Sequence, residues 1–402
     1  MIDLTGRDRP DMVLLIVLLV LFLIGLATVY SASTVISESG LFGKQIMWSV
    51  FGLTAFLVGT TISLRRLEEI SPVAYAFVCL LLLATLFIGS GPANRWIIIG
   101  PVHLQPSEIA KAGLILVTAW WLASQKVRPR KFGEILIFLT VIPAVVLTAI
   151  QPDLGTAVSM LLIVLAMFVW AGYGVGWIIL LVSPILAAVS SMNILLWLGF
   201  MLILTIILYR RKYSVPIWIA FMGGNSIVAA LTPMAWKMLE PYQQSRLITF
   251  LNPANDPHGS GWNIIQSEVA VGSGGLSGQG FLQGAQKELA FLPARHTDFV
   301  FSVWAEETGF IGCLILLTAF FILFWRTIVA ARKSINPFNS LVAAGIGAYI
   351  GIHVFVNVGM TLGIMPVTGL PLPLISYGGS QLVTVLFLIG LVLNAGMYWR
   401  EV

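Results

Sequence analysis

The sequence contains little charge and almost no cysteine. Asp, Glu, Lys and Arg make up 10% of its 402 residues, against about 25% in soluble domains. The two cysteines, Cys79 and Cys313, lie inside apolar runs, so neither a disulfide framework nor a cysteine metal site is indicated. The glycine-rich stretch 272–280 lacks a following Gly-Lys-Ser/Thr, so no phosphate-binding loop is predicted. The net charge of +5 does not indicate nucleic acid, because membrane proteins keep Lys and Arg in cytoplasmic loops.

Long apolar runs take the place of the missing charge, and hydrophobic residues make up 58% of the chain. Runs of roughly 17–25 residues are candidate membrane spans. They lie near 12–31, 45–62, 72–89, 107–124, 133–150, 155–172, 175–191, 193–209, 215–233, 300–325, 337–359 and 378–398. The first has no convincing cleavage site after it and is interpreted as a retained span. The sequence therefore predicts an all-α polytopic membrane protein, a bundle of about twelve transmembrane helices forming one membrane domain over 1–402.

The basic residues give these spans a consistent orientation. Clusters precede the first span and follow the second, fourth, eighth, tenth and twelfth spans. They are Arg7 and Arg9, Arg65 and Arg66, 126–131, 210–212, 326–333, and Arg400. Since basic loops stay on the cytoplasmic side, both termini are predicted to be cytoplasmic. The large loop 234–300 and the shorter loop 90–106 are then extracytoplasmic.

The loop 234–300 is the main polar segment of the chain. A loop this long is usually functional or disordered, and its aromatic and aliphatic residues favour an ordered, water-facing segment. Its glycines indicate a flexible or tightly turning stretch. Arg246 is interpreted either as a phosphate ligand or as a marker of the loop entrance.

The end of this loop places Arg295, His296, Thr297 and Asp298 side by side before an apolar run begins at Phe299. Thr297 or Asp298 is expected to cap the following helix, and capping is compatible with a role for Asp298 as a base. His296 is more often a structural hydrogen-bonding residue than a catalyst. Glu306, with its neighbour Glu307, indicates a polar cavity within the tenth span.

Two further segments carry polar residues at the ends of spans. Pro106 suits the first position of a helix, and Glu108 and Lys111 then share a face, as a structural ion pair or as functional groups in a cavity. Arg95-Trp96 is either an interfacial anchor or a substrate contact. Asp153 is expected to cap the sixth span.

The last outer loop, 363–380, is rich in proline and glycine and includes Ser376 and Tyr377. A loop of this kind at membrane depth has to be buried in protein or line a cavity. Asn357, in the preceding span, is expected to satisfy part of its backbone.

Together these segments resemble the SEDS family of bacterial membrane proteins, whose members include RodA and FtsW. The matching elements run through most of the chain. They are 95–96, 105–111, 151–156, Arg246 with 250–253, 261–267, 292–299, Glu306-Glu307 and 371–380. The sequence around Gln266 and over 295–299 is closer to RodA than to FtsW.

The resemblance implies an enzyme, a peptidoglycan glycosyltransferase that polymerises lipid II at the outer face of the bacterial cytoplasmic membrane for cell elongation. It implies a class B penicillin-binding protein as partner, alongside membrane lipids. It matches Asp298 to the family's essential outer-loop aspartate, Trp96 to its outer-loop tryptophan, and Glu108 with Lys111 to its intramembrane charged pair. Family members usually have ten spans, so two of the apolar runs around 176–233 are predicted to be an extra transmembrane pair.

The expected mechanism is an inverting glycosyl transfer with Asp298 as general base and cationic side chains facing the leaving diphosphate. The candidate substrate-binding residues are Arg95, Trp96, Glu108, Lys111, Arg246, His296, Thr297, Glu306, Ser376 and Tyr377. A divalent cation, Mg or Mn, is a possible cofactor, without a ligand cluster that proves it. Two alternatives stay open: a flippase for lipid-linked sugars, which would keep its key charges near the midplane, and a non-catalytic scaffold for a penicillin-binding protein.

Overall fold

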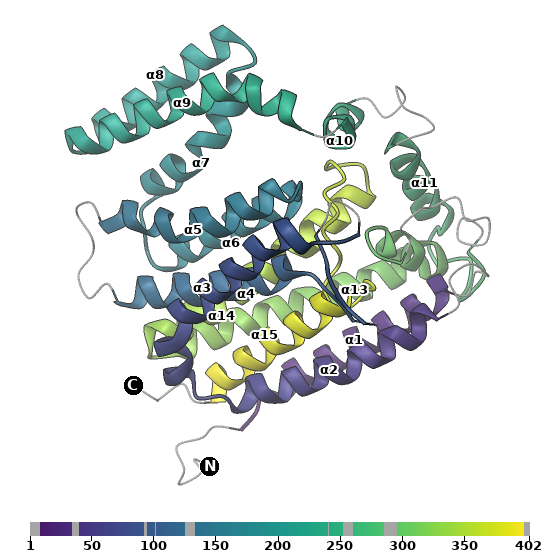
Figure 1. The fold of residues 1–402 in the computed structure, drawn as a ribbon. Helices are drawn as coiled ribbons and strands as arrows, with labels where there is room; N and C mark the ends of the chain where they lie inside the picture. The colour runs from purple at the N-terminus through teal and green to yellow at the C-terminus, as the bar shows by residue number, and fades with distance from the viewer. Residues whose placement is uncertain are drawn as a thin grey trace. The chain divides into compact units, whose positions relative to one another are not determined.

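The computed structural model describes residues 9–33, 40–91, 95–100, 102–124, 133–239, 241–251, 260–284 and 296–397. The chain divides into two compact units, one formed by Met1–Met167 with Arg246–Val402 and the other by Phe168–Ser245, and each is described by itself. The predicted all-α class is confirmed, because helices make up most of both units (Figure 1). The helices are α1 (Met12–Ser33), α2 (Leu41–Thr61), α3 (Leu64–Ile88), α4 (Pro106–Ser124), α5 (Gly133–Ile150), α6 (Leu154–Trp170), α7 (Val175–Ser190), α8 (Ile194–Arg210), α9 (Val215–Met238), α10 (Pro241–Leu251), α11 (Ser260–Ser273), α13 (Val300–Lys333), α14 (Pro337–Thr361) and α15 (Gly379–Met397).

The protein is a multi-pass membrane protein. Within the described residues, seven helices are long and apolar enough to cross a bilayer: α1, α2, α3, α9, α13, α14 and α15. Each of the other predicted runs also coincides with a helix, but these helices are shorter or, like α4, carry buried charge. The count of twelve crossings stays a prediction. The segment 234–300 contains α10 and α11, so part of the predicted outer loop is helical.

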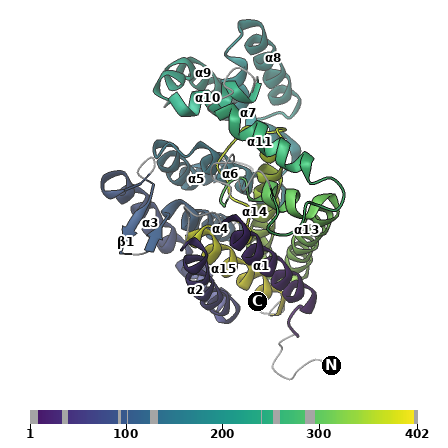
Figure 2. The same cartoon turned by 90° about the vertical axis from the view of Figure 1, so that its right-hand side faces the viewer.

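In the first unit, α14 lies between α4 and α13 (Figures 1 and 2), and α2 packs along α15. The second pairing depends on glycines, since a Cβ added to Gly59 would lie 2.5 Å from the Phe387 carbonyl oxygen and one on Gly390 2.4 Å from that of Phe56. Small residues allow transmembrane helices to approach this closely. Asn394 on α15 fixes the contact by donating to the carbonyls of Gly59 (3.0 Å) and Ile62 (2.7 Å).

The glycine run closes a break in α13. Gly309 has a φ of 65° and interrupts the helix, and the run supplies hydrogen bonds there, since Phe310 donates to Gly275 at 2.9 Å and Gln279 to Glu306 at 2.9 Å. A Cβ on Gly278 would lie 2.1 Å from the Glu307 carbonyl oxygen. Of the two alternatives for these glycines, the tightly turning segment is therefore the one observed.

A small hairpin, which the sequence analysis did not predict, lies between α3 and α4. Strands β1 (Ile97–Ile99) and β2 (Val102–Leu104) pair antiparallel, and Trp96 forms an isolated bridge with Ser90. The run of three isoleucines before Gly100 is the signal that was available, because β-branched residues next to a turn glycine favour a hairpin. The hairpin fixes Arg95 and Trp96 at one end and leads into α4 at the other.

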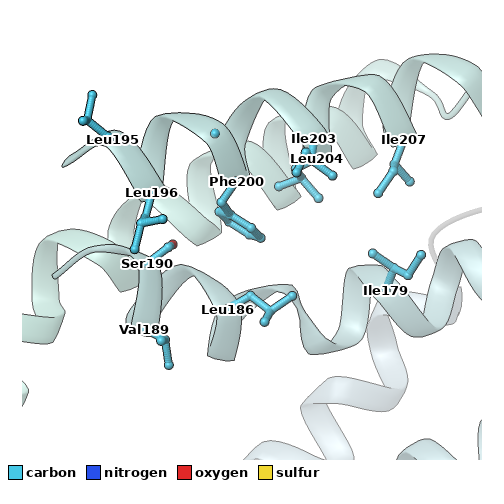
Figure 3. A pocket seen from close by; sticks show the side chains of 11 residues that line it. Ile179, Leu186, Val189, Ser190, Leu195, Leu196, Phe200, Ile203, Leu204 and Ile207 are labelled. Atoms are coloured by element: carbon cyan, nitrogen blue, oxygen red, sulfur yellow. The ribbon is translucent and has the colours of Figure 1, made fainter. Parts of the chain in front are cut away.

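The second unit contains α7, α8 and α9, with a hollow of about 460 Å³ lined by α7 and α8. Figure 3 shows Phe200 and Ile207 of α8 pointing toward Leu186 and Ile179 of α7. The lining is apolar apart from Ser190, as expected for a surface that contacts lipid tails. The range 176–233 contains three helices, α7, α8 and α9, and whether two of them are additional to the family's helices stays a prediction.

Candidate functional site

One cavity in the first unit collects most of the predicted site residues. Its volume is about 300 Å³. Eight of the residues singled out from the sequence line it: Arg95, Trp96, Glu108, Asp153, Arg246, Thr297, Asp298 and Tyr377. They come from the segment that leads into the hairpin, from α4 and α10, and from the segments that precede α6, α13 and α15. Both signs of charge therefore converge on one hollow, as expected for a site that binds a polar ligand.

Asp298 is positioned by the backbone on either side of it. The Ser376 hydroxyl donates to the Thr297 carbonyl at 2.6 Å, and the Tyr377 amide donates to the His296 carbonyl at 2.8 Å. The rings of His296 and Tyr377 also meet edge to face at 5.7 Å. The loop before α15 thus fixes the backbone of His296–Asp298, which we call the acid segment. The Asp298 side chain itself is left at the cavity wall.

Asn357 of α14 adds a third restraint. Its amide nitrogen donates to the carbonyls of Asp298 at 3.0 Å and Leu370 at 2.8 Å. The predicted role of Asn357 in satisfying the backbone of the last outer loop is confirmed. Asn357 is completely buried. Its single side chain therefore connects α14 to the segment that carries Asp298 and to the last outer loop at Leu370.

The prediction that Thr297 or Asp298 caps the next helix is wrong. The helix α13 begins at Val300, its N-cap is Phe299, and no side chain caps it. Asp298 lies one residue too early to occupy the capping position. The carboxyl is therefore not committed to the helix end and faces the cavity instead.

The surroundings of Asp298 raise its pKa above the usual range of an aspartic acid. Burial is the main cause, because a charged carboxylate loses hydration, and the nearby charge of Asp153 adds to it. Arg246 is the main opposing influence on this pKa, with smaller contributions from the Thr297 hydrogen bond and Arg95. A carboxyl with a raised pKa is a stronger proton acceptor once it is ionised.

Gly369 brings the last outer loop close to both charged groups. It has a φ of +74°, and a Cβ there would lie 3.7 Å from Arg246 Nη1 and 3.7 Å from Asp298 Oδ2. The positive φ favours glycine, whereas a Cβ at these distances would make only ordinary van der Waals contact. Residue 369 therefore lies beside both the Asp298 carboxylate and the Arg246 guanidinium group.

Arg95 and Asp153 form the opposite wall. Arg95 donates from Nε to the Gln151 carbonyl at 2.9 Å and from Nη2 to that of Pro152, and its Nη1 lies 3.7 Å from Asp153 Oδ1. Asp153 also accepts from the Thr156 amide at 3.3 Å, so its predicted capping of α6 is confirmed. Arg95 is thus anchored on the turn before α6, whereas Arg246 is the cation that acts most on Asp298.

The charged pair of α4, Glu108 and Lys111, is almost completely buried. Lys111 Nζ lies 2.8 Å from Glu108 Oε1 and 3.2 Å from His353 Nε2. An ammonium group has only donors, so Nε2 is the acceptor and the ring proton is assigned to Nδ1, which lies 3.3 Å from the Pro371 carbonyl oxygen. Tyr349 covers Lys111, with its ring 5.1 Å from Nζ. The predicted Glu108–Lys111 pair is confirmed, and it connects through His353 to the cavity wall at Pro371.

Four predicted residues do not line the cavity. Lys111 lies behind Glu108, and Ser376 and His296 act from behind the acid segment. Glu306 is buried at another place on α13, where a Cβ on Gly284 would lie 2.6 Å from its Oε2. Arg295 lies outside the described residues.

Seven further residues line the cavity that the sequence analysis did not single out as site residues: Gln105, Thr156, Gly369, Pro371, Gly378, Ser380 and Gln381. Five of them lie within segments that carry the family resemblance, and Gly369 and Gln381 lie beside one; all seven are uncharged, so no charge drew attention to them. Ser380 accepts from the Gln105 amide at 2.9 Å, and Gln381 donates to the Pro371 carbonyl at 2.9 Å. The first bond joins the residue before α4 to the start of α15, and the second joins α15 to the loop that precedes it; sequence spacing alone reveals neither.

In the part of the chain that the structure describes, side chains alone do not form a metal centre. No group of three or more His, Cys, Asp or Glu side chains there is arranged to hold a metal ion. The cavity does present the carboxylates of Glu108, Asp153 and Asp298, which are ligands that Mg²⁺ accepts together with substrate phosphates. These three carboxylates are therefore the side chains in the cavity that would hold a divalent cation together with the phosphates of a ligand.

Comparison with known proteins gives consistent matches over almost the whole chain. The model of the FtsW/RodA/SpoVE family, described as cell cycle protein, matches residues 11–199 and 194–401. The peptidoglycan glycosyltransferase MrdB of Escherichia coli is 34% identical over 387 residues, covering 96% of this chain and 92% of MrdB. The peptidoglycan glycosyltransferase RodA of Treponema pallidum is 34% identical over 427 residues, covering 97% and 98%.

Solved structures agree with these matches. A chain of a peptidoglycan synthase complex is 30% identical, with a TM-score of 0.69 and coverage of 96% of this chain and 97% of that chain. The rod shape determining protein RodA of Thermus thermophilus is 27% identical, with a TM-score of 0.65 and coverage of 98% of both chains. With its cavity, its charged pair and these matches along nearly its full length, the chain belongs to the family of FtsW, RodA and SpoVE, the SEDS family.

Proposed function

We propose that this protein is a peptidoglycan glycosyltransferase that polymerises lipid II, with Asp298 as its general base. Relatives at 34% identity over nearly the full chain are named peptidoglycan glycosyltransferases. The observation that carries the residue assignment is that Asp298, Arg246 and Arg95 line one cavity of about 300 Å³. An acid whose charge is opposed by burial and supported by a cation suits proton transfer.

The reaction is a single displacement. The 4-hydroxyl oxygen of the acceptor sugar forms a bond to the anomeric carbon of the donor sugar, and the bond from that carbon to the polyprenyl diphosphate breaks with inversion. Asp298 takes the hydroxyl proton as the new bond forms. The bonding electrons leave on the diphosphate, whose developing charge needs cations fixed in advance.

The two arginines divide this work. Arg246 faces the space beside Asp298 and Gly369, so we assign it to the leaving diphosphate, which guanidinium groups bind in a bidentate manner. Arg95 already donates to two backbone carbonyls and lies beside Asp153. Its main role is to fix the turn before α6 and the hairpin that carries Trp96.

The proposal extends to the cellular role, the partner and the location of the protein. We infer a role in elongation, with a class B penicillin-binding protein as partner, because the named relatives include RodA and MrdB. A related chain is part of a peptidoglycan synthase complex. We place the protein in the bacterial cytoplasmic membrane, with both termini cytoplasmic, because the basic clusters fall on one predicted side.

The test is lipid II polymerisation by the purified full chain, with and without a chelator and without any partner. We expect glycan strands from the wild type and a rate reduced on the order of 10²- to 10⁴-fold in Asp298→Asn. Glu268→Gln, an exposed acid on α11, is the matched control and should keep the wild-type rate. Full activity of Asp298→Asn would remove the base assignment.

The same assay separates the alternatives. Transfer of lipid-linked sugar across vesicles without polymerisation would identify a flippase. Activity that appears only when a penicillin-binding protein supplies its own glycosyltransferase would identify a scaffold. Loss of the wild-type rate in chelator, restored by Mg²⁺ or Mn²⁺, would show that a cation shares the work of Arg246.

A further inference from the structure

Three polar residues of α14 follow one another at intervals of four residues: Tyr349, His353 and Asn357. Residues four apart lie on the same face of a helix, and all three side chains are completely buried. Tyr349 and His353 contact Lys111. Asn357, at the C-terminal end of this row, contacts the chain beside the cavity instead, so the same helix face reaches from the charged pair of α4 to the segment that carries Asp298.

Asn357 uses both hydrogens of its side-chain amide on backbone carbonyls. The acceptors are the carbonyl of Asp298, at 3.0 Å, and that of Leu370, at 2.8 Å. Leu370 follows Gly369, the residue that lies beside the Asp298 carboxylate and the Arg246 guanidinium group. One side chain therefore fixes the acid and the part of the last outer loop that faces it on a single helix.

This arrangement requires an asparagine. Two carbonyls in different segments need two donor hydrogens, and a hydroxyl group supplies one, whereas a carboxylate or an aliphatic side chain supplies none. Lysine and arginine have enough donors, but a charge buried this completely is costly. Glutamine keeps the amide but displaces it by one methylene group. A neutral amide at this distance from α14 is therefore what the two carbonyls need.

The other restraints on the acid segment act on its earlier residues. Ser376 and Tyr377 donate to the carbonyls of the two residues before Asp298, so the segment keeps both of these bonds when Asn357 is replaced. The bond that is lost is the one to Asp298 itself. Replacing Asn357 should therefore leave the loop in place and release the residue that carries the carboxylate.

We propose that Asn357 is a positioning residue for Asp298, which sets where the carboxylate lies in the cavity and affects the rate through Asp298. A small displacement of a reacting group lowers the rate strongly. This inference rests on the proposed function of Asp298 as the general base. It adds that the base works only while α14 holds its backbone at the same level as the last outer loop.

The same unit offers a matched control. Asn394 of α15 is 2% exposed and also donates to two backbone carbonyls, at 3.0 and 2.7 Å, but these belong to Gly59 and Ile62 at the end of α2. Asn357→Leu and Asn394→Leu thus remove the same number of buried hydrogen bonds. Both should lower the melting temperature of the full chain in detergent by similar amounts, because each leaves two buried carbonyls without this donor.

The two variants should differ in lipid II polymerisation. We expect Asn357→Leu to lower kcat on the order of 10- to 100-fold with little change in KM, as when an interaction made only in the transition state is lost. Asn394→Leu should keep the wild-type kcat. A wild-type kcat in Asn357→Leu, or an equal loss in Asn394→Leu, would overturn the positioning role.

A double-mutant cycle with Asp298→Asn shows whether Asn357 acts through the carboxylate. The base is already lost in Asp298→Asn, so adding Asn357→Leu should change the residual rate by less than about twofold. A full further loss in the double variant would overturn the positioning role and leave Asp298 as the base. A wild-type rate in Asp298→Asn would overturn the base and its positioning residue together.

Glutamine variants repeat the comparison with the amide retained, and decide it if a leucine variant does not fold. Asn357→Gln should keep more of the wild-type kcat than Asn357→Leu, because it can still donate to the carbonyls, and less than Asn394→Gln. Equal values of kcat for Asn357→Gln and Asn394→Gln would contradict the proposal.

Discussion

The cavity around Asp298 and the sealed network around Lys111 both contain acids and bases, but they use them differently. In the cavity, charged groups sit on loops and helix ends and face open volume. In the network, Glu108, Lys111 and His353 lie within helices, are almost completely inaccessible, and contact one another at 2.8 and 3.2 Å. Groups that leave open volume between them can bind a ligand, whereas groups that satisfy one another hold helices in place. Glu108 lines the cavity, so the two regions meet at its carboxylate.

The largest expected effect comes from breaking the sealed pair on one side. Lys111→Met leaves Glu108 buried without its cation, which should reduce the free energy of unfolding by about 3–5 kcal/mol. The double variant Glu108→Gln/Lys111→Met removes both charges and should recover much of that loss. Thermal unfolding in detergent measures both variants. A double variant no more stable than Lys111→Met would contradict a role of this pair in holding the fold.

A smaller effect is expected when the link from the network to the cavity is cut. His353→Leu loses both polar contacts and should cost about 1–3 kcal/mol, because buried partners are left unsatisfied. His353→Gln places its amide nearer Lys111, and His353→Asn places it nearer the Pro371 carbonyl. We expect Gln to preserve the melting temperature better and Asn to preserve lipid II polymerisation better. Equal losses of both properties in the two variants would show that the link has no separate role at the cavity.

The smallest change, one methyl group, tests the cavity alone. Gly369→Ala adds a Cβ 3.7 Å from both Arg246 and Asp298 at a φ of +74°, and the strain should cost about 1–2 kcal/mol. The rate of polymerisation should fall by roughly 10- to 100-fold, because small displacements at a reacting centre are costly. This loss of rate is larger than the loss of stability alone would produce. Gly172→Ala carries a similar strain at φ +85° with nothing within 4 Å. If it reduces polymerisation equally, the effect of Gly369→Ala is strain alone.

Local contacts within a helix were predictable from the sequence, and long-range contacts were not. The Glu108–Lys111 pair and the capping by Asp153 follow from local helix geometry, so spacing predicted them. His353 was missed because its contacts with Lys111 and Pro371 span 242 and 18 residues, and a lone histidine in an apolar run gives no such signal. The capping prediction for Asp298 failed by one residue, which lies within the usual uncertainty of helix boundaries. The cavity itself depends on long-range hydrogen bonds such as Gln105 to Ser380.

The most direct test of the central claim is the pH dependence of kcat/KM for lipid II polymerisation in wild type, Arg246→Gln and Asp298→Asn. If Asp298 is the base, the rate falls as pH decreases through its pKa, which burial raises and Arg246 lowers. Removing Arg246 should therefore move the acidic limb to higher pH, and the residual activity of Asp298→Asn should lack that limb. An acidic limb that stays in place without Arg246, or that persists without the Asp298 carboxylate, would contradict the account.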